Sequence, residues 1–226
     1  MSDISHLSKG TVHLKNGVAL EVDALVCATG WKQGPAIKFI GISEAALGLP
    51  YRSKEQVPES LSKEADAEVF ARLPKLKNQP ATKPDDRDVA RPYRLYRFMV
   101  PPSLIAERNL VIAGAWSSIA TAPTSTIQGL WISAFLDGLL ERLPVSEESA
   151  RWQMMVHTQF CRRRYPLRFG GVVPEAAFDC IPLLDLMLGD LGLNKHRKSG
   201  RLMEMVEPYT PRDYRAVIDE WIEKHR

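Results

Sequence analysis

The stretch "LVIAGAWSSIATAPTSTIQGLW", positions 110–131, combines an apolar run, a turn of small residues and a helical pattern. Residues 109–116 predict a buried strand, and Ile127 to Arg142 predict a helix that Ser125 or Thr126 caps. A strand, a small turn and a helix together let a backbone approach a phosphate or a flat ring closely. By itself the pattern is weak, because an ordinary tight junction has the same form.

The chain before this stretch is typical of β structure. Asn16-Gly17, between alternating apolar residues, predicts a β-hairpin, because both residues tolerate positive φ. "VDALVCATGWKQG" follows at positions 22–34, and its continuous apolar run predicts a strand buried on both faces, as in a parallel sheet covered by helices. This strand also ends in a turn of small residues.

The other segments alternate between loop and helix. Residues 50–102 are rich in proline and charge and predict a long surface loop or lid with a short helix at 62–73. After it, Ser146 caps an expected helix that ends near Arg164. Two further expected helices are 174–193, interrupted at Pro182, and a last one that begins with Thr210 and Pro211.

The composition limits the partners. The 226 residues carry a net charge of +3, which does not favour nucleic acid, and we interpret the basic clusters at 161–168 and 194–201 as solvated helix ends. Three cysteines without a C-x-x-C motif predict neither a disulfide framework nor a structural zinc, and fit a reducing compartment. The sequence shows no secretory signal and no apolar run long enough to span a bilayer, so we expect a cytoplasmic protein without a membrane partner.

No catalytic group follows from the residues alone. The five histidines lack metal-ligand spacing, and no G-x-S-x-G motif surrounds the serines at 117–125, so neither a metal site nor a hydrolase is predicted. "RPYRLYRF" at 91–98 interleaves arginine with aromatic residues. This segment either packs its tyrosines onto the core or contacts an anionic or aromatic ligand.

Taken together and in this order, the segments resemble the flavin-containing monooxygenases, in particular the fungal branch that acts in secondary metabolism. That family has a strand ending in Ala-Thr-Gly and an aromatic residue, as in "LVCATGW" at 25–31. Next comes a strand of the type N-L-x-x-x-G and a helix with Gln and Trp, as in "NLVIAGAW" and "IQGLW". A third mark, D-x-I-P-x-x-D, is present at 179–185.

The resemblance implies an α/β fold class. It implies a partial FAD/NAD(P)-binding, Rossmann-like fold with a β-hairpin and sheet strands, followed by a mainly helical C-terminal region. Residues 1–142, including the loop at 50–102, would form the C-terminal part of the cofactor-binding domain, and residues 143–226 would form the helical region.

The resemblance also implies the cofactors FAD and NADPH. In the family, the Ala-Thr-Gly turn lies near the junction of the flavin and nicotinamide sites, and the later glycine lies beside the flavin. The implied cofactor contacts, mostly through the backbone, are Ala28, Thr29, Gly30, Trp31, Gly114, Ala115, Trp116 and Gln128.

The family's two G-x-G-x-x-G motifs, which hold the phosphates of FAD and NADPH, do not occur in this sequence. Since these loops supply much of the cofactor's binding, we do not expect tight FAD binding by this chain alone. The resemblance implies a monooxygenase that reduces FAD with NADPH and oxygenates a small organic substrate in secondary metabolite biosynthesis. The alternative is a non-catalytic, truncated remnant or subunit that binds a partner, either another chain or a second copy, or a small molecule, without redox chemistry.

Overall fold

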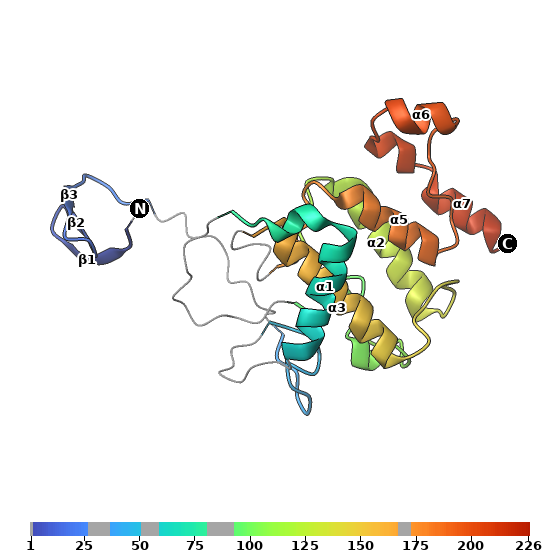
Figure 1. Ribbon diagram of the computed structural model, residues 1–226, viewed down its shortest axis with the longest axis horizontal. Coiled ribbons are helices and arrows are strands. Elements are labelled where there is room, and N and C mark those ends of the chain that lie inside the picture. The colour runs from blue at the N-terminus through green and yellow to red at the C-terminus, as the bar shows by residue number, and fades with distance from the viewer. Residues whose placement is uncertain (1, 27–36, 51–58, 81–92, 167–172) are drawn as a thin grey trace. The chain divides into compact units, whose positions relative to one another are not determined.

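The computed structural model describes residues 2–26, 37–50, 59–80, 93–166 and 173–226 (Figure 1). Its contacts divide the chain into two compact units, Met1–Lys32 and Gln33–Arg226. The boundary expected between residues 142 and 143 lies inside the second unit. The assignment of a cofactor-binding domain and a helical region to its two sides stays a prediction.

The first unit is a three-stranded antiparallel sheet, ordered β1 (Ile4–Ser8), β2 (Thr11–Leu14) and β3 (Ala19–Glu21). The predicted hairpin is confirmed, because β2 pairs with β3 around Asn16-Gly17. Gly17 has φ +84°, and the Asn16 side chain accepts a hydrogen bond from the amide of Val18 at 3.2 Å. The strand β1 was not predicted.

Both strands predicted outside the hairpin are wrong where the structure describes them. Residues 22–26 form no strand, and Val26 is 87% exposed; residues 27–34 lie outside the described residues. Residues 109–116 are not a strand either, although the amide of Ile112 donates to the carbonyl of Met99 at 2.9 Å. A strand needs a row of backbone partners, and the described neighbours of this segment offer single bonds only.

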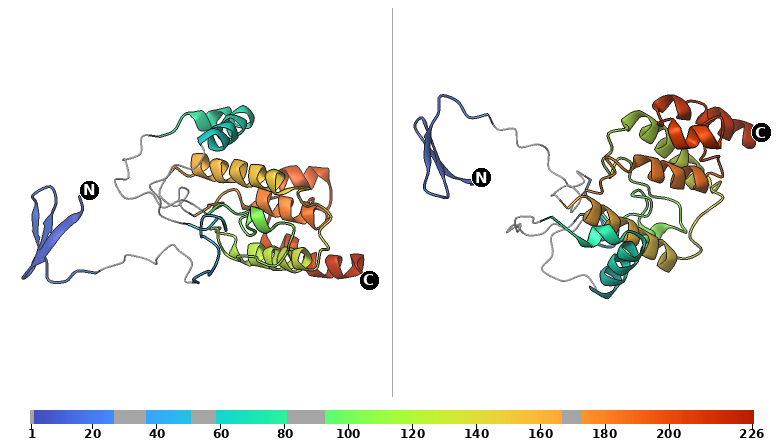
Figure 2. Two further views of the ribbon diagram at one scale, coloured as in Figure 1. Left: turned by 90° about the horizontal axis from the view of Figure 1, so that it is seen from below. Right: turned by 45° about the horizontal axis from the view of Figure 1, so that its top comes forward.

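The second unit is helical. Its described helices are α1 (Glu59–Arg72), α2 (Thr121–Leu136), α3 (Glu147–Arg164), α5 (Cys180–Asp190), α6 (Arg201–Val206) and α7 (Val217–Lys224). Short 3₁₀ turns occur at Pro74–Lys77, Pro102–Leu104 and Pro211–Tyr214. Helix α1 packs on α3, and α2 packs on α5 (Figure 2). The α/β class is therefore confirmed, whereas the described residues contain no parallel sheet of the expected Rossmann type.

Helix α2 begins six positions earlier than predicted. Residues Thr121 to Thr126 form its first turns, with Pro123 near the start, where a missing amide hydrogen costs no intrahelical bond. Neither Ser125 nor Thr126 is therefore a cap. The helix stops at Leu136 rather than Arg142, because Gly138 takes φ +72° and its amide donates back to Phe135.

The remaining helix predictions are largely confirmed. Helix α1 contains the predicted 62–73 helix except Leu73, and Ser146 caps α3 by accepting a hydrogen bond from the amide of Ser149 at 3.2 Å. Of the predicted helix 174–193, only Cys180–Asp190 is helical, as α5, and Pro182 does not interrupt it, because it lies in the first turn. Thr210 caps a 3₁₀ turn, and α7 follows only at Val217.

Residues 95–102 form part of the core instead of a surface loop or lid. Leu95, Tyr96, Met99 and Val100 are at most 1% exposed. The interpretation of "RPYRLYRF" as a segment that packs onto the core is thereby confirmed for the described residues 93–98. The apolar core of α2 and α5 closes over this segment.

One buried charge network joins the segment to both helices. The Arg97 guanidinium donates to both carboxylate oxygens of Asp190, at 2.7 and 3.0 Å, and Trp131 Nε1 donates to Asp190 Oδ2 at 3.0 Å. Arg97 is 7% exposed and Asp190 is 2% exposed. A buried ion pair of this kind is tolerated because every charge has close partners.

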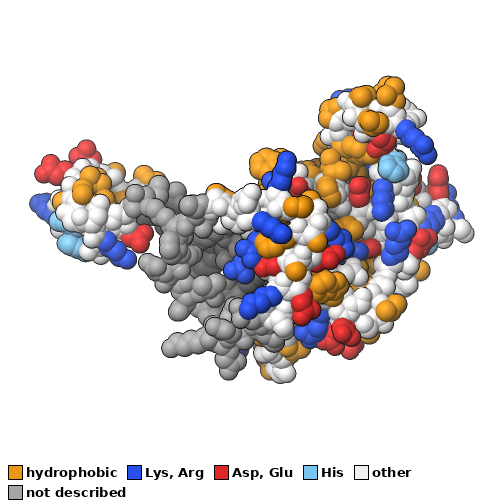
Figure 3. All heavy atoms as spheres, in the orientation of Figure 1, with side chains coloured by type: hydrophobic (Ala, Val, Ile, Leu, Met, Phe, Trp, Pro, Cys, Tyr) orange, Lys and Arg blue, Asp and Glu red, His pale blue; other side chains and the backbone are white. Residues whose placement is uncertain are grey.

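The basic clusters are not simply solvated helix ends. In the first, Arg163 forms a two-bond ion pair with Asp66 of α1, and Arg164 contacts Asp179 at 3.0 Å. In the second, the side chains of Arg197 and Lys198 are 5% and 3% exposed and are bound by carboxylates. Figure 3 shows basic and acidic side chains interspersed over the visible face of the second unit.

Among the residues that the structure describes, no helix combines the length and apolar character needed to span a bilayer.

Candidate functional site

The turn at Gly114 is the centre of the candidate site. Gly114 takes φ +71°, a left-handed conformation that favours glycine, and its amide donates to Gln128 Oε1 of α2 at 3.3 Å. A Cβ atom built on Gly114 would meet no heavy atom of the described residues within 4 Å. The turn therefore presents an uncovered backbone beside α2.

Two buried polar atoms on α2 lack partners within the described part of the chain. They are Gln128 Nε2 and Thr124 Oγ1. Residues four apart lie on one face of a helix, so the two atoms belong to the same stripe of α2. Because Gln128 Oε1 already accepts from Gly114, its Nε2 is the atom left to donate elsewhere. Each unpaired buried polar group costs about 1–3 kcal/mol, which a ligand with matching atoms would recover.

Aromatic side chains form the apolar side of the turn. Ala115 and Trp116 are 6% and 8% exposed, and the Trp116 ring stacks on Phe98 with 6.2 Å between ring centroids. Phe98 and Arg97 both have positive φ, +59° and +52°, which is strained backbone for residues with a side chain. The side chain of Trp116 thus belongs to the core, and its contribution to a ligand would come through the backbone.

The N-terminus of α2 adds a positive end. Ala120 is the N-cap residue, and no side chain caps the helix. A helix of 16 residues carries partial positive charge at this end, which attracts anionic or electron-rich groups.

Of the titratable side chains near these aromatic residues, His157 is the one in ring contact with Phe98, at 6.1 Å between centroids. Burial, with smaller contributions from Arg97 and Arg72, lowers the pKa of His157 to about 3. The imidazole is therefore neutral at physiological pH. Among the described residues of the site, none forms an acid–base pair with His157.

The structure brings together four of the eight predicted cofactor residues. The turn of Gly114, Ala115 and Trp116 meets Gln128 midway along α2, through the bond from the Gly114 amide. Ala28, Thr29, Gly30 and Trp31 lie outside the described residues. Thr124 was missed, because the helix was expected to begin only at Ile127; its spacing of four from Gln128 is the signal that could have found it.

Comparison with curated proteins finds several fungal relatives. The FAD-dependent monooxygenase rstn6 of Aspergillus nomiae is 35% identical over 221 residues, which cover 93% of this chain and 37% of the relative. The FAD-dependent monooxygenase resA of Aspergillus sclerotiorum is 33% identical over 93% of the chain and 37% of its own length. For the FAD-dependent monooxygenase DEP4 of Alternaria brassicicola, the identity is 32% over 97% of the chain and 39% of the relative.

The chain spans well under half the length of these curated relatives. No protein-family model matches it, and no solved structure matches it closely enough to support the expected Rossmann-like fold. The alignments nevertheless cover 93–97% of this chain. The chain is thus homologous, over almost its full length, to one part of the fungal FAD-dependent monooxygenases.

Proposed function

We propose that this chain forms the part of an FAD-dependent monooxygenase that holds the flavin ring beside Gly114 and α2. The observation that carries the proposal is the unpartnered pair on α2, Thr124 Oγ1 and Gln128 Nε2, next to an uncovered glycine turn. An isoalloxazine ring has a flat face and an edge of carbonyl and nitrogen acceptors. The glycine turn fits the flat face, and the unpartnered atoms of Thr124 and Gln128 fit the edge. The homology to proteins named FAD-dependent monooxygenases supports the same ligand.

FAD, when bound and reduced by NADPH, would supply the redox chemistry that oxygenates a small organic substrate of secondary metabolism. The chain's own residues bind and orient. Gly114 leaves room for the ring, and Gln128 donates to an acceptor atom on its edge. The buried aromatic residues Trp116 and Phe98 keep water from this side of the ring.

The pyrophosphate end of FAD needs other contacts. We propose that a complementing chain with a G-x-G-x-x-G loop supplies them, since this loop does not occur in the sequence and a second copy of this chain would lack the loop as well. The assembly would act in the cytoplasm.

The experiment is an FAD titration of the purified chain, followed by flavin fluorescence, with two matched variants. Gln128→Glu keeps the acceptor for the Gly114 amide and removes the Nε2 donor, so we expect FAD affinity to fall at least about tenfold. Gln153→Glu makes the same change on α3, away from the turn, and should leave the affinity unchanged.

The outcomes separate the alternatives. Flavin binding that supports NADPH oxidation favours the monooxygenase, whereas flavin binding without NADPH oxidation favours the non-catalytic subunit. A chain that binds no FAD, alone or mixed with a protein carrying the phosphate loops, overturns the proposal. Equal affinities of the two glutamate variants would overturn the assignment of Gln128.

A further inference from the structure

A second site lies near the end of the chain, formed by residues after α5. It is a pocket of about 450 Å³, within the range of small-molecule sites. Its lining residues are Asn194, His196, Arg197, Arg212, Asp213, Arg215, Ala216 and Glu220. None of the residues of the Gly114 turn lines it, so its ligand is independent of the flavin proposal.

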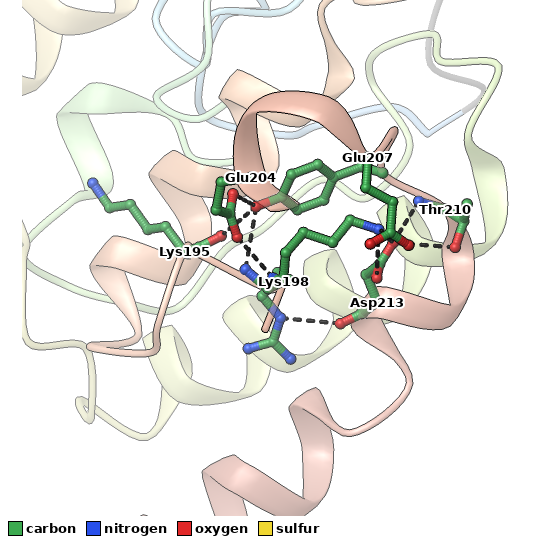
Figure 4. Close-up of polar contacts among 8 residues, drawn as sticks. Lys195, Lys198, Glu204, Glu207, Thr210 and Asp213 are labelled. Atoms are coloured by element: carbon green, nitrogen blue, oxygen red, sulfur yellow. Dashed lines mark hydrogen bonds and ion pairs between the residues drawn. The ribbon is translucent and has the colours of Figure 1, made fainter. Parts of the chain in front are cut away.

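Both carboxylates of this pocket are already neutralised. Glu220 receives two bonds from the Arg197 guanidinium, at 2.7 and 2.8 Å, while Arg197 also donates to the carbonyl of Asp213 at 3.1 Å. Figure 4 shows the Lys198 ammonium between Asp213 and Glu207, and it lies 3.0 Å from both Asp213 oxygens. In these pairs two cations, Arg197 and Lys198, hold three carboxylates, so the wall is fixed and carries one net negative charge.

Asp213 is held especially firmly in its ionised form. Its carboxylate accepts from the amide of Thr210 at 2.6 Å, and this bond, together with Lys198, lowers the pKa of Asp213. The carboxylate therefore faces its own partners and is not available to neutralise another cation.

Two arginines on the same pocket stay uncompensated. Arg212 and Arg215 are exposed, and neither has an ion-pair partner among the described residues. Arg212 lies in the 3₁₀ turn Pro211–Tyr214, and Arg215 is its C-cap residue, whose amide donates to the carbonyl of Arg212. Both side chains line the same pocket, so an anion bound there would be stabilised by two positive charges.

We propose that this pocket binds the phosphate group of a small molecule, held by Arg212 and Arg215. Each guanidinium presents a planar pair of donors that matches two phosphate oxygens. A carboxylate has only two oxygens, which one guanidinium fork occupies, whereas a phosphate dianion has enough oxygens and charge for both. The exposed His196 also lines the pocket, and its Nδ1 lies 3.7 Å from Glu204. The volume leaves room for an organic group beside the phosphate.

The test is calorimetric titration of the full chain with inorganic phosphate and with adenosine 5′-monophosphate, at low salt. Saturable phosphate binding that weakens at least about tenfold in the double variant Arg212→Ala, Arg215→Ala supports the site. The control is Arg162→Ala, which removes an exposed arginine of α3 and should change nothing. Because all three side chains are exposed, unfolding curves should be the same for the variants.

The two probes distinguish the source of the phosphate. Tighter binding of the nucleotide assigns the pocket to a phosphorylated metabolite, and tighter binding of phosphate assigns it to the free ion. No saturable phosphate binding, or equal binding by the double variant and the wild type, overturns the proposal. None of these outcomes depends on whether the chain binds FAD.

Discussion

Buried polar groups differ between the two halves of α2 in whether they have hydrogen-bond partners. Near its C-terminal half, Trp131 shares the Asp190 carboxylate with Arg97, and the charged and donating groups of this network are bonded. Near its N-terminal half, Thr124 and Gln128 each keep a buried polar atom without a partner in the described chain. One helix thus contributes both to a buried polar network that is saturated, meaning that its groups are hydrogen-bonded, and to a buried pair of groups that is unsaturated, meaning that each keeps a polar atom without a partner in the described chain.

The difference separates what holds the fold from what is left for a ligand. Saturated buried groups stabilise a packed structure only while all partners are present, whereas unsaturated ones cost free energy until something binds them. Changes in the Asp190 network should therefore damage stability. Changes at Thr124 or Gln128 should cost little stability, or raise it, and damage binding.

The largest effect is expected for Asp190→Ala. Arg97 would remain buried without its counter-charge, so the free energy of unfolding should fall by about 3–5 kcal/mol, measured by urea denaturation. Asp137→Ala, an exposed aspartate just after α2, is the control and should cost less than about 0.5 kcal/mol. Equal losses in the two variants would contradict the central role of the network.

The second largest effect is expected from low pH, which should lower the stability of the protein through His157. The pKa of this side chain is lowered to about 3 by burial and by Arg97 and Arg72, against 6.5 in an unfolded chain. Between these values only the unfolded state binds the proton, so stability falls as the pH drops, by about 2 kcal/mol between pH 7.5 and pH 5. Urea curves at the two pH values measure the loss, and His157→Leu should remove most of it. A pH-independent wild type would show that the ring is solvated.

Removing an unpaired hydroxyl should stabilise the free protein. Thr124→Val deletes the unsatisfied Oγ1 at nearly constant volume, so we expect a gain of about 1 kcal/mol in the free energy of unfolding and weaker FAD binding. The matched control is Thr158→Val on α3, because Thr158 Oγ1 donates to the carbonyl of Met154 at 2.8 Å. The free energy of unfolding of Thr158→Val should fall by about 1 kcal/mol. A change of the same sign in both variants would contradict the comparison.

The smallest effect is expected on the surface. Arg151 pairs with Glu147 one turn away on α3, and both side chains are about half exposed, at 50% and 48%. Arg151→Ala should change the free energy of unfolding by only about 0.3–0.5 kcal/mol, as thermal denaturation at moderate salt can show. A loss comparable to that of Asp190→Ala would mean that burial does not determine how much an ion pair contributes to the stability of this protein.

Local signals predicted the local structure. Asn16-Gly17 fixed the hairpin through its turn chemistry, and Ser146 marked the start of α3 through its cap. The start of α2 was missed because most residues from Thr121 to Thr126 are weak helix formers, and packing of the helix against the core outweighs that preference. The strands at 22–34 and 109–116 were expected from apolar runs, but pairing depends on distant partners that no local run encodes.

The candidate site was predictable only in part. Gly114 and Gln128 came from the resemblance, and the structure joins them through one hydrogen bond. The Arg97–Asp190 pair had no sequence signal, because its members are 93 positions apart. The free arginines of the second pocket were hidden in the same way, since a sequence does not show which carboxylates are already occupied.

The Asp190 network also has a consequence for the order of events in folding. Its carboxylate meets donors that lie 59 and 93 positions away along the chain. Contacts that close such long loops form only after most of the second unit has collapsed, and until then both charges stay hydrated. The ion pair should therefore be absent from the transition state of folding and form only after it. Its main effect would be on how slowly the native protein opens, and so on its lifetime against proteolysis.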